Sequence, residues 1–224
     1  MTSVSILNRR DFQNILALLN NTFEEQKTYL CSLDAEIGDG DHGFSMSRGF
    51  NALAANLDMY STLSIGSLLK KAGFELINSI GGAAGAIFGT LFLGQAAYYE
   101  SHLVGKEELE LQDLSGMWSE ALARIKARGD AQPGEKTMID ALEPAAAALS
   151  QASAQSLPLA LAFQNACQAA WQGAQSTREM QGKRGRAKFL AERSIGHLDP
   201  GAMSTYFILK TISDYIDLQA GKGH

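Results

Sequence analysis

Residues 9–34 read RRDFQNILALLNNTFEEQKTYLCSLD, a stretch whose large apolar side chains repeat with the period of an α-helix. Intervals of three, four or seven residues place these side chains on one helical face. They are Phe12, Leu16, Leu19, Phe23, Leu30 and Leu33. Asn8 belongs to the residue types that cap helix N-termini, and the glycines from Gly38 onward interrupt the pattern. The sequence therefore predicts one long amphipathic helix over 9–34.

The rest of the chain also has the composition of a helical protein. Ala and Leu, which are strong helix formers, are abundant, whereas Val, which favours strands, occurs only at positions 4 and 104. The sequence predicts seven further helices, at about 44–59, 64–79, 83–102, 111–128, 135–151, 157–181 and 201–219. The connections between them are mostly short, so neighbouring helices are expected to pack antiparallel. We predict an all-α protein of eight helices without a substantial sheet.

Length, charge and cysteine content narrow the class of protein further. The 224 residues, of which 46% are hydrophobic and 19% charged, are enough for one buried core. No linker or repeat divides them, so we expect a single domain over 1–224. The net charge of −5 argues against a nucleic-acid binder. Cys31 and Cys167 make no disulfide framework, and residues 1–12 lack the apolar segment of a secretory signal, which predicts a cytoplasmic protein.

One uncharged stretch, residues 78–99, is about long enough to cross a bilayer. Its five glycines and several polar side chains lower its hydrophobicity, however, and basic anchors are missing from its ends. We therefore expect no membrane segment. A buried helix is predicted instead, with small residues that let a neighbouring helix or a ligand approach its backbone.

Three carboxylates gather in the glycine-rich stretch LDAEIGDGDHG at 33–43, namely Asp34, Asp39 and Asp41. Carboxylates this close repel one another unless a cation lies between them. Mg²⁺ prefers such oxygens and leaves coordination positions for phosphate and water. An EF-hand is excluded because the twelfth loop position is not Glu, and zinc is disfavoured because His42 is the only soft ligand nearby. An acidic surface turn without a metal stays open as the alternative.

Three further motifs are each weak evidence alone. SIGGAAG at 79–85 starts a predicted helix, where free backbone amides can hold an anion, although a tight turn explains it equally well. RGDAQPGEKTM at 128–138 is a polar turn. The basic run KRGR at 183–186 precedes SIGHLDPG at 194–201. Together with the acidic loop, this basic loop suggests the two ends of a metal–nucleotide site.

In their order and spacing, these motifs resemble the nucleotide-binding DhaL subunits of dihydroxyacetone kinases, and the resemblance covers nearly the whole chain. It implies a single-domain barrel of eight antiparallel amphipathic helices, which binds ADP or ATP at one end through two Mg²⁺ ions. It also implies Asp34, Asp39 and Asp41 as the metal ligands. The positions that match the family's nucleotide contacts are His42, Gly43, Phe44, Ser45, Ala83, Ala84, Gly129, Met138, Arg186, Asp199, Pro200 and Gly201. At Ala84 the family usually has Ser, so a hydroxyl contact to phosphate is absent here.

The resemblance further implies an enzyme, a phosphotransferase subunit that carries its nucleotide as a coenzyme. A DhaM-like subunit of the phosphoenolpyruvate-dependent phosphotransferase system would phosphorylate the bound ADP. The ATP formed would then phosphorylate dihydroxyacetone on a DhaK-like subunit. We assign no catalytic residue in this chain, because phosphoryl transfer depends on positioning and charge neutralisation more than on covalent chemistry.

Two other functions stay open at this point. One is a subunit of a kinase that uses free ATP on dihydroxyacetone or on a tetrulose such as erythrulose. The other is a non-catalytic nucleotide-binding regulator of a transcription factor. The sugar and the oligomeric state, a homodimer included, are equally open.

Overall fold

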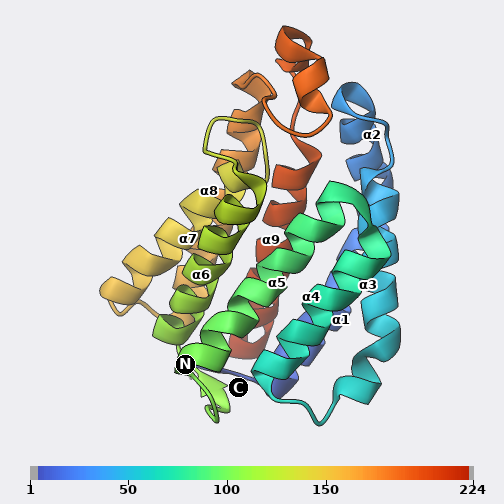
Figure 1. Cartoon of the computed structure of the whole chain (residues 1–224). Coiled ribbons are helices and arrows are strands. Elements are labelled where there is room, and N and C mark those ends of the chain that lie inside the picture. Colours follow the sequence, from blue (N-terminus) through green and yellow to red (C-terminus); the bar gives the residue numbers. More distant parts are fainter. Residues whose placement is uncertain (1–4, 222–224) are drawn as a thin grey trace.

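A computed structural model describes residues 5–221 and confirms the all-α prediction (Figure 1). Its nine α-helices within that range are α1 (Arg9–Glu25), α2 (Lys27–Ile37), α3 (His42–Asn56), α4 (Ile65–Ile80), α5 (Gly82–His102), α6 (Leu111–Gly129), α7 (Ile139–Ala154), α8 (Leu159–Ser176) and α9 (Pro200–Gly221). Residues 1–4 and 222–224 of the predicted 1–224 domain lie outside the described residues, and so does part of the N-terminal stretch 1–12.

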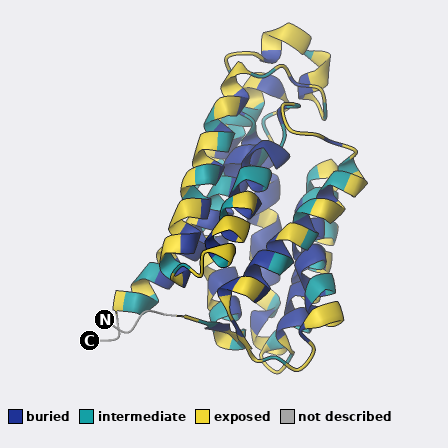
Figure 2. Ribbon diagram, turned by 90° about the vertical axis from the view of Figure 1, so that its left-hand side faces the viewer, coloured by how far each residue is buried: buried dark blue, intermediate teal, exposed yellow. Residues whose placement is uncertain are grey.

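The helices pack side by side around a common apolar interior. From α3 to α9, consecutive helices pack against each other. Helix α9 also packs against α1 and α2 and so closes the ring. Figure 2 shows buried residues along the inner faces of the helices and exposed residues on the outside. One cluster of buried apolar side chains, from Leu7 to Ile216, includes members of all the helices. The described helices therefore share one continuous core.

The predicted helix over 9–34 is wrong in one respect, because it is divided at Gln26. This residue has φ −87° and ψ 1°, and it separates α1 from α2. Phe23 and Leu30, on either side of it, are both fully buried. The apolar period therefore continues across the break, and neither Gly nor Pro marks it in the sequence. With α1 and α2 taken as one interrupted helix, the predicted number of eight fits the described chain.

Two other predicted boundaries differ from the structure by four residues or more. Helix α7 begins at Ile139 rather than near 135, because Gly134 (φ 82°) and Lys136 (φ 62°) adopt left-handed backbone conformations that no helix contains. Helix α8 ends at Ser176, and short 3₁₀ turns follow it instead of the predicted continuation to 181. A two-residue antiparallel pairing, β1 (Leu7–Asn8) with β2 (Glu108–Leu109), is the small sheet that the sequence did not predict.

The uncharged stretch at 78–99 belongs mostly to α5, whose glycines allow close packing against α4. A Cβ atom on Gly73 would lie 2.8 Å from the carbonyl oxygen of Gly89, and one on Gly89 would lie 2.6 Å from that of Gly73. The small residues therefore bring two helix backbones together. Within residues 5–221, the structure contains no helix long and apolar enough to span a bilayer.

Candidate functional site

A cavity of about 640 Å³ opens at one end of the helix bundle. We call it the end cavity. The loop between α2 and α3, the turns α4–α5 and α6–α7, and the segment between α8 and α9 all contribute to it, at the upper end of Figure 1. The predicted site residues that line it are Asp34, Asp39, Asp41, His42, Ser45, Ala83, Ala84, Gly129, Met138, Arg186, Asp199, Pro200 and Gly201. Motifs far apart in the sequence thus meet in one place.

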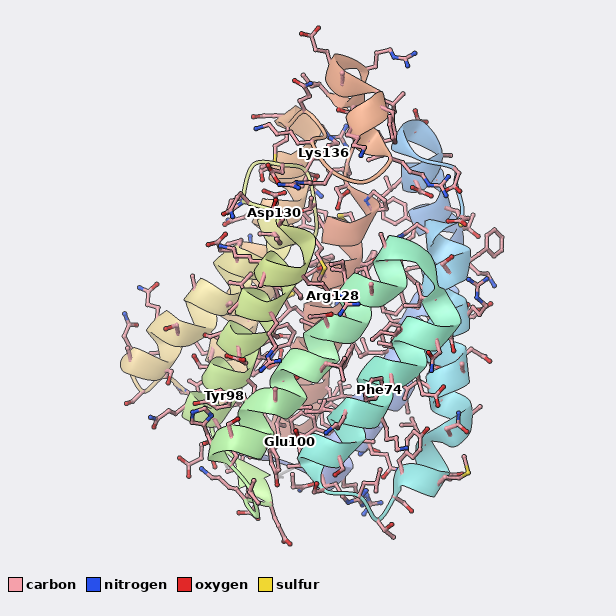
Figure 3. The ribbon with its side chains drawn as sticks, in the orientation of Figure 1. Phe74, Tyr98, Glu100, Arg128, Asp130 and Lys136 are labelled. Carbon is pink, nitrogen blue, oxygen red and sulfur yellow. The ribbon has the colours of Figure 1, made fainter. Side chains whose placement is uncertain are left out.

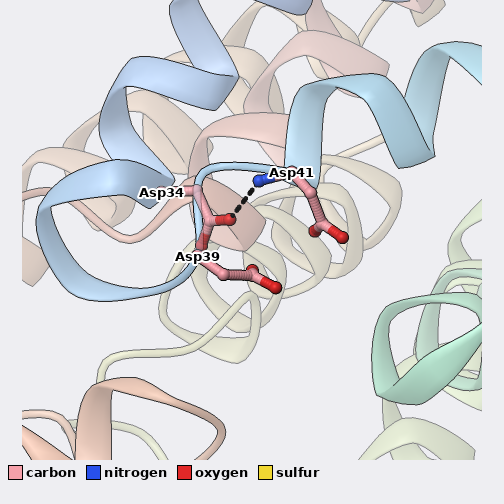
Figure 4. Close-up of side chains that lie close together, drawn as sticks. All are labelled: Asp34, Asp39 and Asp41. Carbon is pink, nitrogen blue, oxygen red and sulfur yellow. Dashed lines mark hydrogen bonds between the residues drawn. The ribbon is translucent and has the colours of Figure 1, made fainter.

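The acidic loop brings its three carboxylates together (Figure 4). One oxygen from each of Asp34, Asp39 and Asp41 lies within 4.8 Å of the other two. The Asp34 carboxylate accepts hydrogen bonds from the backbone amides of Asp41 (3.0 Å) and His42 (3.2 Å), which fixes the end of α2 to the start of α3. A Cβ atom on Gly38 would lie 2.1 Å from Asp34 Oδ1, so this position accommodates only glycine. Backbone amides therefore hold the Asp34 member of the triad in place.

The electrostatics of the cavity favour a cation. Burial raises the pKa of Asp34, and the nearby Asp39 carboxylate adds to the effect, while backbone hydrogen bonds oppose it. Burial likewise raises the pKa of Asp199 to about 7, and it outweighs the hydrogen bond from the Ala202 amide. Arg186 forms an ion pair with Asp39. Because several carboxylates share a partly buried space, a bound cation would relieve their repulsion.

The α4–α5 turn presents a helix N-terminus to the cavity. Gly81 (φ 75°) and Gly82 (φ 57°) adopt left-handed conformations, and no side chain among residues 5–221 caps the start of α5. Ala83 and Ala84 follow directly and line the cavity. Uncapped amides at a helix N-terminus form a site for anions such as phosphate.

Arg48 is a structural residue of this site that sequence analysis missed. From α3, its Nε donates to the carbonyl oxygen of Ser79 (2.8 Å), and Nη2 donates to that of Ile80 (2.9 Å). It thereby satisfies carbonyl groups at the C-terminus of α4 and holds the glycine turn in position. An arginine within a helical pattern gives no signal of such a long-range role.

His42 lines the cavity as a neutral side chain. Burial lowers its pKa to about 4, although the neighbouring Asp41 carboxylate opposes this effect. Its Nε2 shares a 2.8 Å hydrogen bond with the hydroxyl of Ser204 on α9. A neutral imidazole can make a hydrogen bond to a nucleotide but supplies no positive charge at neutral pH.

Gly43 and Phe44 are the two predicted nucleotide contacts that do not line the end cavity. Gly43 lies at the contact between α3 and α2, where a Cβ atom would come 2.0 Å from the carbonyl oxygen of Lys27. The Phe44 side chain is 59% exposed, and the Lys27 ammonium lies over its ring at 5.9 Å from the centroid. The structure thus assigns Gly43 to helix packing and places the Phe44 ring on the surface.

Replacing Gly43 with alanine is expected to destabilise the protein, because the added methyl group meets backbone atoms that cannot rotate away. Overpacking of this kind typically costs about 1–3 kcal/mol, or a Tm lower by roughly 2–12 °C for a domain of this size. Thermal melting of the nucleotide-free protein measures the effect. Gly221→Ala is the matched control, because its Cβ would meet no atom of the described residues within 4 Å. Equal melting temperatures for the two variants would contradict the packing role.

The basic run at 183–186 divides into two roles. Arg184 forms ion pairs with Glu135 at 2.7 Å and with Asp130 at 3.6 Å, so it holds the segment to the α6–α7 turn. Arg186 instead reaches Asp39. Lys136, a second residue missed in the sequence, also lines the cavity and lies with Asp130 toward the same end of the molecule in Figure 3. The motif at 133–138 is therefore more than a polar turn.

The remaining lining of the cavity includes a group of apolar side chains. They come from α4 to α7 and from the α6–α7 turn, and are Ile80, Ala86, Ile87, Phe88, Ile125, Ala131, Met138 and Ile139. A cavity that combines carboxylates, uncapped amides and such an apolar part suits a ligand with a charged end and a flat apolar end.

Comparisons with known proteins point to a kinase family with ADP-binding members. A family model described as the DAK2 domain matches residues 36–214. Over 207 residues the chain is 39% identical to "PEP-dependent dihydroxyacetone kinase, ADP-binding subunit DhaL" of Escherichia coli (strain K12), which covers 92% of this chain and 97% of that protein. It is also 37% identical over 190 residues to the "L-erythrulose kinase" of Pectobacterium atrosepticum, covering 83% of this chain but 31% of that protein.

A solved structure has the same fold. It is the dihydroxyacetone kinase from C. freundii in complex with AMP-PNP and Mg²⁺, which matches with a TM-score of 0.69 and 26% identity. The match covers 96% of this chain and 36% of that one. The chain therefore spans about a third of the length of this larger kinase.

Proposed function

Because this chain belongs to the DAK2 domain family, we propose that it is the ADP-binding subunit of a PEP-dependent dihydroxyacetone kinase. The observation that carries the proposal is the end cavity, which unites a carboxylate triad, an uncapped helix N-terminus and an arginine. The similarity to the Escherichia coli subunit, which extends over 97% of that protein's length, supports a subunit of this type.

Asp34, Asp39 and Asp41 are the residues that would hold Mg²⁺, and we propose two ions. Three carboxylate oxygens within 4.8 Å are the hard donor set that this ion prefers. The raised pKa of Asp34, caused first by burial, also fits a site that is completed by positive charge. The metal would supply charge neutralisation for the nucleotide phosphates.

The nucleotide itself would extend from the triad into the apolar part of the cavity. The amides at the start of α5, beside Ala83 and Ala84, would hold phosphate oxygens. Arg186 would add a positive charge, and Met138 would pack against the base. The absence of a hydroxyl at Ala84 removes at most one neutral hydrogen bond, worth about 0.5–1.5 kcal/mol, so the backbone amide remains the main contact.

In the proposed reaction, bound ADP accepts a phosphoryl group from a DhaM-like subunit and donates it to dihydroxyacetone on a DhaK-like subunit. Both partners must reach the end cavity. The segment that carries Arg186 is open to them, since the Arg186 side chain is 64% exposed and the nearby Phe189 is 77% exposed. The chain's own residues bind and orient the nucleotide and neutralise its charge, which is most of what phosphoryl transfer requires.

A second candidate is a subunit of a free-ATP kinase acting on a tetrulose. The 37% identity to the L-erythrulose kinase of Pectobacterium atrosepticum favours it. The two candidates differ in how long the nucleotide stays bound, because a coenzyme must outlast many partner encounters.

The purified protein is expected to carry about one adenine nucleotide per chain. At saturating Mg²⁺, labelled ADP should exchange with excess unlabelled ADP far more slowly than one catalytic turnover. Mass analysis of the purified chain and release of label from filtered protein measure these two quantities. Complete exchange within a single turnover would reject the coenzyme function and favour the free-ATP kinase.

A further inference from the structure

The segment 177–199, between α8 and α9, carries Arg186 but has little regular structure to fix its position. It consists of loops and three 3₁₀ turns, η2 (Thr177–Glu179), η3 (Ala187–Phe189) and η4 (Ala191–Ser194). Such short turns have poor hydrogen-bond geometry and hold their conformation weakly on their own. The segment also forms hydrogen bonds within itself, such as that from Gly182 N–H to Ser194 Oγ (2.8 Å), so contacts with the rest of the protein are needed to fix where it lies at the cavity.

Lys136 fastens both ends of this segment from inside the protein. Its Nζ donates to the carbonyl oxygens of Thr177 (2.6 Å) and Met180 (3.3 Å) at the start of the segment, and to that of His197 near its end. An ammonium group has three donor hydrogens, so these three acceptors account for all of them. The residue is 1% exposed. A buried charge whose donors are all given to one segment is a strong and specific tether.

Glu135, the preceding residue, holds the middle of the same segment. Its carboxylate forms the 2.7 Å ion pair with Arg184, and its backbone carbonyl accepts a 3.1 Å hydrogen bond from the amide of Lys183. Arg184 lies two residues before Arg186. Adjacent residues of one turn thus hold the ends and the middle of the segment.

The backbone of the turn is built to present these two side chains. Lys136 has φ 62°, a left-handed conformation that is unfavourable for a residue with a Cβ atom. The Asp140 carboxylate accepts hydrogen bonds from the backbone amides of Gly134 and Thr137, which lie on either side of Lys136 in the sequence. Strained backbone persists where the surroundings over-determine it, often for a functional reason.

We propose that Glu135 and Lys136 form a two-point anchor that positions Arg186 over the end cavity. Both are positioning residues, because they act on the nucleotide through the segment and its arginine. The inference rests on the proposed function in one respect, namely that Arg186 contacts the nucleotide phosphates. The anchor itself is testable without any nucleotide.

Trypsin is a direct probe of the anchor, because the segment contains several cleavage sites. In the nucleotide-free protein, Lys136→Met is expected to speed cleavage after Lys183, Arg184 and Arg186 at least about tenfold, since proteolysis follows the population of the opened segment. Mass analysis identifies the sites, and circular dichroism shows that the helices are retained. Lys70→Met removes an equal charge from the exposed surface of α4 and should leave these rates unchanged.

Glu135→Gln provides a second variant on the more exposed half of the anchor. It should speed the same cleavages to a smaller extent, and it keeps the anchor testable if Lys136→Met does not fold. Cleavage at the wild-type rate in a folded Lys136→Met protein, or in Glu135→Gln if the former is unfolded, would overturn the proposal.

Release of a fluorescent ADP analogue at fixed Mg²⁺ then tests whether the anchor acts through Arg186. Lys136→Met should release it at least about tenfold faster, equivalent to about 1.4 kcal/mol. The double variant with Arg186→Ala should be no faster than the faster single variant. If the two single variants' rate increases multiply in the double variant, Lys136 acts independently of Arg186, and the positioning role is overturned. If the wild type binds no ADP, the proposed function fails, and the tryptic rates alone decide whether the anchor exists.

Discussion

Replacing Asp41 with asparagine is expected to lower phosphotransfer at least about 100-fold while the helical fold is retained. Within the described chain, no hydrogen bond or ion pair uses the Asp41 carboxylate, so its loss removes no structural contact. The change removes one proposed metal ligand and leaves phosphate charge uncompensated in the transition state. The rate of transfer to dihydroxyacetone at limiting Mg²⁺, with the partner subunits present, measures the effect.

The thermal stability of this variant should not fall with its activity. Without nucleotide and metal, Asp41→Asn should melt at the wild-type temperature or slightly above it, because it relieves repulsion with Asp34 and Asp39. Asp58→Asn, in the exposed 3₁₀ turn after α3, is the control for loss of a surface carboxylate. Near-normal transfer by the Asp41 variant would remove this residue from the metal site.

Removal of Mg²⁺ and nucleotide is expected to lower the Tm by about 5–10 °C. A ligand that binds only the folded protein, present at about 100 times its Kd, stabilises it by roughly 2.7 kcal/mol. In a domain of this size each kcal/mol corresponds to about 2–4 °C. The comparison is between protein treated with EDTA and desalted, and the same sample after addition of Mg²⁺ and ADP.

Two controls complete this experiment. The Asp41→Asn protein should gain much less from Mg²⁺ and ADP, which would tie the shift to the carboxylate triad. Mass analysis must show that the treated wild type has lost its nucleotide. An unchanged melting curve after confirmed loss would contradict tight binding of a coenzyme.

The helices were predictable where apolar period and terminal signals coincide. The predicted C-terminal ends of α5 and α6 lie within one residue of the structure, and for α6 Gly129 marks the end of the apolar period. The break at Gln26 was not predictable, because the buried face runs through it unchanged. The start of α7 was missed because a lysine in a left-handed conformation has no sequence signature. Hydrogen bonds from its side chain to the segment 177–199, and from the flanking amides to Asp140, stabilise Lys136 there.

The candidate site was predictable where residue type alone determines chemistry. Clustered aspartates and adjacent glycines point to metal and phosphate in the sequence itself, and these positions line the end cavity. Arg48 and Lys136 were not identified from the sequence, because they donate hydrogen bonds to backbone carbonyl groups that are distant in the sequence. Gly43 lies within the same motif as the aspartates, yet its close approach to Lys27 gives it a packing role.

In the ion pair between Arg186 and Asp39, the guanidinium is the counter-ion of a carboxylate that lines the end cavity. A divalent cation arriving at Asp39 must displace the guanidinium, and a phosphate group arriving beside it offers that guanidinium a new partner. Each ligand thus prepares the position that the other needs. Metal and nucleotide are therefore expected to bind with positive heterotropic cooperativity, equal in both directions by linkage. Because exposed ion pairs contribute only about 0–1 kcal/mol, this exchange should enhance either affinity by a factor of about five at most.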